Sequence, residues 1–415
     1  MSEWKEVRLG DVCTELSDGL HKAPLFVEGG DYIFVNAKNL CNGSIVDNDP
    51  TKKTTHEEYL KYSKPLNENT ILFSIDGTIG NIARYKGEKC VLGKGACYIN
   101  PNPVLADSSY IYFQLQSPHF NSYLNCMSTG STIKHISLKT IRNYEFTLPP
   151  LSVQCRISSV LSTLDDKIAV NRRICENLEA QAQALFKHWF IDFAPFKNGK
   201  FVESELGMIP EGLIYKRIGE MPHTLETGKR PSGGVKGIES GVPSIGAENI
   251  KGLGCYDYSK TKFVTEEYAA SMKKGKINGY ELLIYKDGGK PGYFIPNYAI
   301  FGGGYPYDEM CLNEHVFKLD FGNRGYSLFA YFFFKTKQIM SYLNAQGAKA
   351  AIPGINSKDI EAILMPSLEN KWVKDYCNEV EDVITQILML SKESARLSTL
   401  RDTLLPKLMS GQIKV

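Results

Sequence analysis

Two long stretches of the chain show the hydrophobic periodicity of an amphipathic helix. Residues 152–190 contain no glycine or proline and are rich in Ala, Leu, Gln and Glu, which favour helix. Their apolar positions recur at alternating steps of four and three, the heptad pattern of a helix that packs along a seam. Residues 369–405 show the same pattern. The sequence therefore predicts two long helices, each with one apolar seam.

The two seams correspond position by position. The first contains Ile157, Leu161, Leu164, Ile168, Asn171, Cys175, Leu178, Ala182, Leu185 and Trp189. The second contains Tyr376, Val380, Val383, Ile387, Leu390, Ser394, Leu397, Arg401, Leu404 and Leu408. Each member of the second seam lies 219 residues after its counterpart, as in 376 − 157 = 219. The polar Asn171 interrupts the first seam, and such a residue commonly fixes the register of a coiled coil at some cost in stability.

The correspondence extends upstream and indicates an internal duplication. The tetrapeptide SYLN occurs at residues 122–125 and 341–344, again 219 apart. Asp76 and Asp287, each in an Asp-Gly pair after an apolar strand-like run, are separated by 211. The spacing grows along the repeat, so we expect an extra loop in the second copy, within Phe301–Cys311. The chain thus contains a unit of about 210 residues twice.

The order of elements predicts an α+β architecture with two similar globular domains. Each globular unit is followed by a long helix, and matched seams favour pairing of the two helices. We therefore expect an antiparallel two-helix coiled coil with one globular domain at each end, related by an approximate twofold axis. The expected boundaries are residues 1–150 and 197–367 for the globular domains and 151–196 and 368–415 for the helices. The alternative is two independent helices, each packed on its own domain.

Composition leaves the class of ligand open. The 415 residues include 48 Lys and Arg against 46 Asp and Glu, so any nucleic-acid surface must be a local basic patch. The ten cysteines contain no C-x-x-C pair, which favours reduced cytosolic thiols over a zinc ribbon. The N-terminal sequence has no apolar run typical of a signal peptide, and no apolar stretch approaches membrane-spanning length. We expect a cytoplasmic protein without membrane contact.

Recognisable catalytic motifs are absent from the sequence. It contains no phosphate-binding G-x-x-x-x-G-K-[ST] loop and no G-x-G-x-x-G after a strand. It also lacks the Asn/Asp-Pro-Pro-aromatic run used by amino-methyltransferases, and its seven histidines have no metal-ligand spacing. Asp76 and Asp287 are interpreted as turn residues. We expect a protein without catalytic activity, metal or cofactor of its own.

Three segments resemble a known family. They are LEAQAQALFKHWFIDFAPF (178–196), LSTLRDTLLPKLMSGQIKV (397–415) and the loop TGKRPSGG (227–234). Together with the duplicated order of unit and helix, they resemble the specificity subunit of type I restriction-modification systems. The resemblance covers nearly the whole chain, and the two helix endings are its most specific part.

The resemblance implies a non-catalytic DNA-recognition subunit in phage defence. Each globular unit would be a target recognition domain that reads one half of a split double-stranded DNA sequence. The helices would set the distance between the halves and carry two modification subunits, which use S-adenosylmethionine to methylate adenine. Restriction or translocase subunits would join them. The alternatives are a specificity subunit of a related phage-defence modification system and a coiled-coil scaffold with two protein-binding modules.

The candidate DNA-binding residues are cations and small polar residues in Gly/Pro-rich loops, where a backbone can approach phosphate. In the second unit they are Lys229, Arg230, Ser232, Lys286 and Lys290, with Tyr305 and Tyr307 in the extra loop. In the first unit they are His21, Lys22, Thr78, Asn81, Lys134 and His135. Each could instead be a solvated charge or a turn residue.

Overall fold

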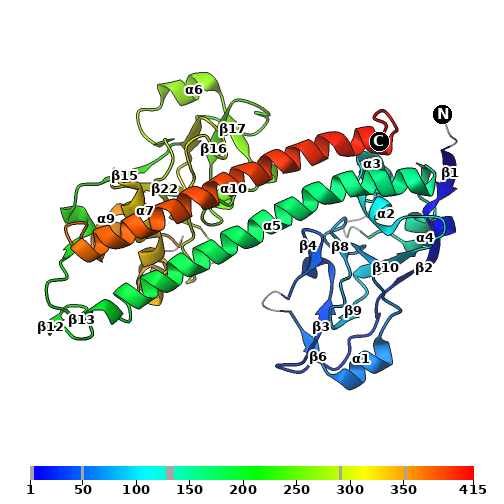
Figure 1. The fold of residues 1–415 in the computed structure, drawn as a ribbon. Coiled ribbons are helices and arrows are strands. Elements are labelled where there is room, and N and C mark those ends of the chain that lie inside the picture. Colours follow the sequence, from blue (N-terminus) through cyan, green and yellow to red (C-terminus); the bar gives the residue numbers. More distant parts are fainter. Residues whose placement is uncertain (1–3, 48–50, 128–134, 289–291, 350–352) are drawn as a thin grey trace. The chain divides into compact units, whose positions relative to one another are not determined.

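The computed structural model describes residues 4–47, 51–127, 135–288, 292–349 and 353–415 (Figure 1). The contacts between residues divide the chain into two compact units. The first unit comprises the chain up to Lys167 together with Leu397–Val415, and the second comprises Ile168–Arg396. The two long helices, α5 (Leu151–Phe190) and α10 (Lys371–Met409), each contribute to both units. Both long helices predicted from the periodicity are thus confirmed.

The first unit contains two main sheets. A four-stranded antiparallel sheet has the order β2-β10-β7-β8, and a three-stranded sheet has the order β6-β3-β9 with β3 and β9 parallel. The pair β1-β11 and the short pair β4-β5 complete the strands. The strands are β1 (Lys5–Arg8), β2 (Cys13–Asp18), β3 (Tyr32–Val35), β4 (Leu40–Cys41), β5 (Ser44–Ile45), β6 (Lys53–Thr54), β7 (Ile71–Ser74), β8 (Ile82–Arg84), β9 (Cys90–Leu92), β10 (Ala96–Pro101) and β11 (Glu145–Leu148). The helices are α1 (His56–Tyr62), α2 (Ser108–Gln114), α3 (Pro118–Met127) and α4 (Leu138–Arg142).

The second unit repeats this strand order. Its four-stranded sheet is β15-β22-β19-β20, and its second sheet is β17-β16-β21-β18 with β16 and β21 parallel. The pair β14-β23 corresponds to β1-β11, whereas the hairpin β12-β13 and strand β18 have no counterpart among the described strands of the first unit. The strands are β12 (Phe201–Ser204), β13 (Gly207–Pro210), β14 (Tyr215–Arg217), β15 (Thr224–Thr227), β16 (Val242–Ile245), β17 (Lys262–Val264), β18 (Lys276–Ile277), β19 (Leu282–Tyr285), β20 (Tyr298–Ala299), β21 (Met310–Leu312), β22 (Val316–Asp320) and β23 (Leu364–Pro366). The helices are α6 (Glu266–Ser271), α7 (Arg324–Phe334), α8 (Lys337–Gly347) and α9 (Ser357–Glu361).

The strand registers correct the predicted position of the extra loop. Phe73 pairs with Ile82, nine residues on, whereas its counterpart Ile284 pairs with Tyr298, fourteen residues on. The turn between β19 and β20 is therefore five residues longer than its equivalent. The equivalent hairpin pairs are Leu72–Ala83 and Leu283–Ala299. From these pairs to the end of the parallel strand, the first unit uses 92 − 83 = 9 residues and the second uses 312 − 299 = 13. The insertion is thus split between two loops, and only the second part lies within Phe301–Cys311.

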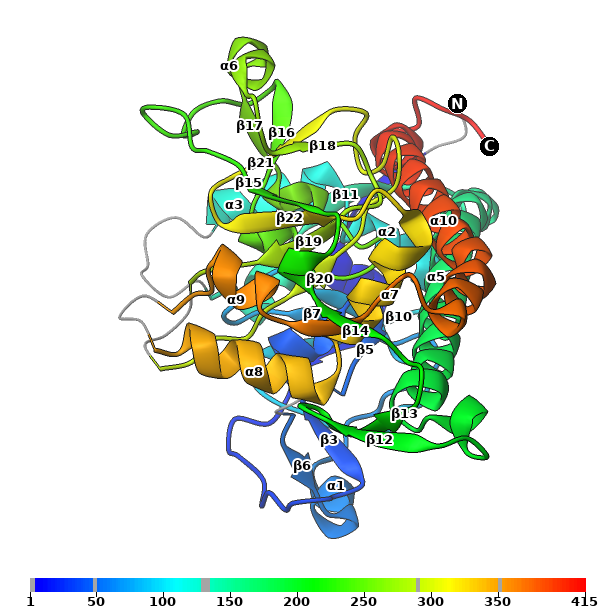
Figure 2. The same ribbon diagram turned by 90° about the vertical axis from the view of Figure 1, so that its left-hand side faces the viewer.

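Aromatic side chains dominate the core of the second unit. Helix α7 lies between the β15-β22-β19-β20 sheet and α10 (Figure 2). Phe329 of α7 packs on Tyr376 of α10 and on Phe186 and Phe190 of α5, with ring centroids 4.9 to 5.8 Å apart. In the first unit the corresponding core joins α2–α4 to Ile157 and the buried C-terminal turns of α10. In each unit, therefore, segments of both long helices complete the hydrophobic core.

Within each unit the two helix segments run antiparallel. In the second unit, the side-chain nitrogen of Asn171 donates to Glu393 at 2.7 Å and to the Ser394 hydroxyl at 3.3 Å. Further along, the Tyr376 hydroxyl donates to the carbonyl of Ala182. The first unit pairs Asp165 with Arg401 at 2.7 Å. Every seam position named above is buried or partly buried, including Leu161, Leu164, Ile168, Asn171, Leu178, Leu185, Val380, Val383, Ile387, Leu390, Leu397 and Leu404.

Candidate nucleic-acid interface

An aspartate at the end of a buried strand organises a polar cluster in the first unit. Asp76 follows β7, and one of its carboxylate oxygens lies 2.5 Å from Nδ1 of His135. Lys94 Nζ lies 4.0 Å from the other oxygen. The backbone of Asp76 also pairs with that of His135 in an isolated antiparallel bridge. The carboxylate thus holds one ring nitrogen, and Nε2 of the half-exposed imidazole has no partner among the described residues.

The Asp76 cluster borders a shallow hollow with a volume of about 560 Å³. His21, Thr78 and Lys94 line this hollow together with Lys38 and Asp76. His21 is exposed, and its Nε2 lies 2.7 Å from Asp18. The arrangement brings two of the predicted loops, around His21 and Thr78, to one basic, open surface, as contact with DNA phosphate requires.

The second unit builds the same cluster around the equivalent aspartate. Asp287 follows β19, and its carboxylate lies 2.5 Å from Nδ1 of His315. Lys286 Nζ lies 3.4 Å from the same carboxylate, and His315 Nε2 lies 3.3 Å from Glu314. Glu314 in turn lies 3.8 Å from Nε of Arg230. The cluster therefore connects two predicted cations, Lys286 and Arg230, through acidic side chains.

The two imidazoles come from different places in the repeat. The antiparallel bridge of Asp76 to His135 corresponds to the bridge of Asp287 to Gly354. The position of His315 in the first unit follows from the strand pairing. Ala96 pairs with Ser74, and the equivalent pair in the second unit is Val316 with Tyr285. Gly95, the residue before Ala96, therefore corresponds to His315, the residue before Val316. Each unit thus presents one histidine and one glycine to its aspartate, from opposite loops. Both units therefore pair an aspartate with an imidazole, but the histidine stands at a different position of the repeat in each unit.

Two glycines allow equivalent loops to reach these clusters. A side chain on Gly19 would lie 2.3 Å from the carbonyl of Gly93, and one on Gly228 would lie 1.6 Å from that of Leu312. Only glycine permits such close passage over a strand. The loops that follow carry His21 in the first unit and Lys229 and Arg230 in the second. Both loops therefore occupy the same place in the fold despite their different sequences.

The other predicted contact residues differ in how accessible they are. Lys22, Thr78, Lys229, Arg230 and Ser232 are exposed. The side chain of Asn81 is partly buried and donates to the carbonyl of Ala37 at 2.8 Å, so it supports its own loop. Lys134 and Lys290 lie outside the described residues. The exposed members stay predictions, whereas Asn81 has a structural role.

Tyr305 is a core residue, which corrects its assignment to sequence readout. Its side chain is 5% exposed, and its hydroxyl donates to the carbonyl of Gly254 at 2.7 Å. Tyr307 is partly buried among the rings of Tyr256 and Tyr258. The extra loop lies against α10, since a side chain on Gly302 would meet Leu388 at 3.2 Å. Its two tyrosines therefore fasten the loop to the segment around residues 254–258.

Asp76, Asp287 and His315 are the cluster members that sequence reasoning missed or undervalued. The two Asp-Gly pairs occupy equivalent positions of the repeat, and this signalled a shared role for the aspartates, because a turn alone does not require the same residue in both copies. His315 gave no such signal, since its counterpart is Gly95. Within the described part of the chain, no group of three or more His, Cys, Asp or Glu side chains could hold a metal ion. No described helix is long and apolar enough to cross a membrane.

Comparison with known proteins relates the chain to one family. Residues 1–180 match the family model described as the type I restriction modification DNA specificity domain. The MjaIX specificity subunit of Methanocaldococcus jannaschii is 26% identical over 93% of this chain and 88% of its own length. The HindI specificity subunit of Haemophilus influenzae is 24% identical over the full length of both chains. Residues 1–180 thus carry this DNA specificity domain, and nearly the whole chain is similar to type I specificity subunits.

The fold agrees with that of this family. The type I S subunit from M. genitalium superimposes with a TM-score of 0.53, covering 98% of this chain and 96% of that one at 16% identity. At this identity the likeness concerns the fold alone. In this chain, the two Asp–His clusters and the loops beside them are the candidate DNA-contacting surfaces.

Proposed function

We propose that this specificity subunit reads a bipartite double-stranded DNA target, one half-site with each unit. The observation that carries the proposal is the duplicated cluster. Two units with the same strand order each hold an imidazole on an aspartate beside a glycine-backed loop of cations. Cations position a protein on the phosphate backbone, and side chains with free donors or acceptors read base edges. Different residues around a common framework suit two domains that read different sequences.

The long helices would act as the spacer between the two readers. Matched seams favour an antiparallel coiled coil that relates the domains by an approximate twofold axis. The proposed domains are residues 1–150 and 197–367, with spacer helices in 151–196 and 368–415. A spacer of fixed length would set the number of unread base pairs between the half-sites.

The chemistry would belong to partner subunits. Two modification subunits would bind S-adenosylmethionine and methylate adenine, and restriction or translocase subunits would join the assembly. The specificity subunit would contribute DNA recognition and the surfaces that recruit them. In this view its own residues need no cofactor.

An exchange of one unit tests the modular assignment. Replacing Trp4–Phe146 with the corresponding unit of a relative should change one half-site of the methylated target and leave the other intact. Genomic methylation sequencing, in cells with and without the gene and with the chimaera, gives both motifs directly. If cells that carry the native gene showed no sequence-specific methylation beyond that of cells without it, the assignment would be refuted. If the chimaera changed both half-sites, the units would not be separate readers.

A further inference from the structure

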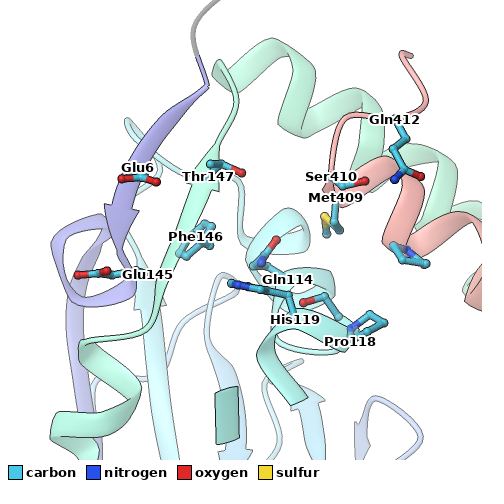
Figure 3. A pocket seen from close by; sticks show the side chains of 12 residues that line it. Glu6, Gln114, Pro118, His119, Glu145, Phe146, Thr147, Met409, Ser410 and Gln412 are labelled. Carbon is cyan, nitrogen blue, oxygen red and sulfur yellow. The ribbon is translucent and has the colours of Figure 1, made fainter. Parts of the chain in front are cut away.

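The first unit contains a pocket that the proposed DNA contacts do not use. Its volume is about 600 Å³, and it lies between β1 and β11, the junction of α2 with α3, and the last turns of α10 (Figure 3). All the residues that line it belong to the first unit. Its walls are partly apolar, with Phe146 and Met409 on facing elements.

A buried amide points into this pocket without a complete set of partners. Gln114 is the last residue of α2 and is only 4% exposed. Its Oε1 has no hydrogen-bond partner among the described residues. Its Nε2 donates to the Tyr144 hydroxyl at 2.8 Å, and that hydroxyl also lies 2.8 Å from Nδ1 of His119. The Tyr144 hydroxyl accepts from the amide and can donate its own proton to His119. This network fixes the amide group with its oxygen towards the pocket.

The second unit places an apolar side chain at the equivalent position. The spacing of 219 that relates the helices assigns Phe333 to Gln114. Phe333 packs on Phe329, with ring centroids 6.4 Å apart, and joins the hydrophobic core. The fold therefore accepts an apolar residue here. A buried acceptor without a partner costs free energy, so the polar choice in the first unit indicates a ligand that supplies the missing donor.

The charge of the pocket selects a cation. Glu6 and Glu145 line it, whereas no lysine or arginine does so among the described residues. Arg8 lies 3.1 Å from one oxygen of Glu145, in an exposed pair that leaves the second oxygen available. The exposed carboxylates of Glu6 and Glu145 and the buried amide oxygen of Gln114 are thus the acceptors along a partly apolar pocket. A guanidinium group, planar and rich in N–H donors, with an apolar stem, matches this set.

We propose that the pocket takes an arginine side chain from a partner protein. A protein source is favoured because a second hollow, also of about 600 Å³, adjoins the first and shares Thr147 and Ser410 with it. Trp4 and Ile157 line this neighbour together with the cations Arg156 and Lys414. The two hollows form a continuous surface that suits a protein segment. The proposal rests on the proposed function for the identity of the partner, which is a modification subunit.

Affinity for the modification subunit of the same system tests the proposal. The full chain is titrated with that purified subunit at fixed salt. Gln114→Leu, and Glu6→Gln combined with Glu145→Gln, should each raise Kd by about tenfold or more, because each removes acceptors from a buried charge. Gln114→Glu adds a carboxylate and should lower Kd. Glu68→Gln, which removes an exposed carboxylate elsewhere in the unit, should leave Kd unchanged.

A structural role for Gln114 would give a different result. Gln114→Leu removes the unpaired acceptor and should unfold at the same temperature as the native chain or higher, so weaker binding cannot be attributed to misfolding. Changing the matching arginine of the modification subunit to alanine should weaken binding as much as Gln114→Leu does. When both changes are combined, the affinity should fall no further. Unchanged Kd in all pocket variants, as expected for a small cationic metabolite, would overturn the proposal. If the native chain bound no modification subunit, the proposed function itself would fail.

Discussion

At the scale of residues, the two aspartates make the sharpest prediction about recognition. Asp76→Asn and Asp287→Asn each weaken the hold on an imidazole, at His135 and His315, without changing side-chain volume. Each should reduce discrimination at one half-site by about tenfold, within the range for a lost base contact. Methylation of target oligonucleotides substituted at each half-site provides the measurement. Asp31→Asn, an exposed position in the first unit, is the matched control.

The aspartate variants separate recognition from folding because each unit serves as the control for the other. Asp76→Asn should leave the preference of the second unit intact, and Asp287→Asn that of the first. Equal losses at both half-sites from a single variant would mean that the cluster supports the fold or the assembly. If neither variant reduced discrimination at its half-site, the clusters would not be part of the DNA interface.

The loop cations of the second unit should act through the phosphate backbone. Lys229 and Arg230 are exposed, and Nε of Arg230 lies 3.8 Å from Glu314. Changing both to Ala should weaken DNA binding and lower the slope of log K against log salt by up to about two. Binding isotherms at several salt concentrations give the slope. The pair Lys197 and Lys200, exposed just before β12 in the same unit, provides an equal change in charge that should leave the slope unaltered.

The residue scale is also where the sequence predicted least. The loops around His21, His135 and Arg230 could be chosen from their cations and glycines. Partners that depend on tertiary contact could not, because nothing local connects His315 with Asp287, 28 positions earlier. Tyr305 shows the reverse error. A tyrosine in an inserted loop suggested exposure, but the loop folds back on α10 and buries the ring.

At the scale of elements, a buried ion pair joins the strands of the second unit. Glu226 of β15 lies opposite Lys318 of β22, with the charged atoms 3.3 Å apart. The carboxylate also accepts from the backbone of Gly275, and this hydrogen bond, together with Lys318, lowers the pKa of Glu226 below its ordinary value of 4.5. Lys318 is only 6% exposed. Its charge therefore depends on this carboxylate and on the carbonyl of Lys276.

Glu226→Gln should destabilise the second unit at neutral pH by about 2 kcal/mol, since it leaves a buried cation without its counter-charge. A lowered folded pKa means that the stabilisation is complete above the unfolded pKa and is lost as pH falls through the folded one. The variant should thus differ most from the native chain above about pH 4.5 and least in acid. Hydrogen exchange at β15 and β22 measures this locally. Glu239→Gln is the exposed control, and an equal loss there would contradict the account.

Elements were predicted well where a long periodic pattern defines them. Both long helices end within a few residues of their expected limits, although α10 continues through Pro406 to Met409. The extra loop was misplaced because the duplicated sequence has few anchors between Gly292 and Val316. Strand pairing supplies those anchors, and it divides the insertion between two loops.

At the scale of the whole molecule, the duplication would let one chain serve the proposed split target. The units share strand order and the aspartate–imidazole pair, whereas their loops differ at the candidate DNA-contacting positions. Selection can then change one reader without disturbing the other. The same separation leaves the spacing of the target to the helices, which carry the matched seams.

The helices should therefore act as a ruler. Seven residues added between Lys167 and Ile168, and seven between Arg396 and Leu397, preserve both seams and enter at the boundary of the two units. The insertions also lie at one level of the helix pair, since Asp165 contacts Arg401 on one side and Asn171 contacts Ser394 on the other. The helices lengthen by about 10.5 Å. At about 3.4 Å per base pair, this equals roughly three additional unread pairs.

Methylation mapping of the lengthened variant should show the same two half-sites separated by a longer gap. The added pairs rotate one half-site by about 100° around the duplex, so activity should fall even though the new spacing is used. Seven residues added to α5 alone would leave the seams unmatched and should abolish methylation. The original spacing at full activity, recovered with both insertions present, would show that an element other than the paired helices sets the distance between the readers.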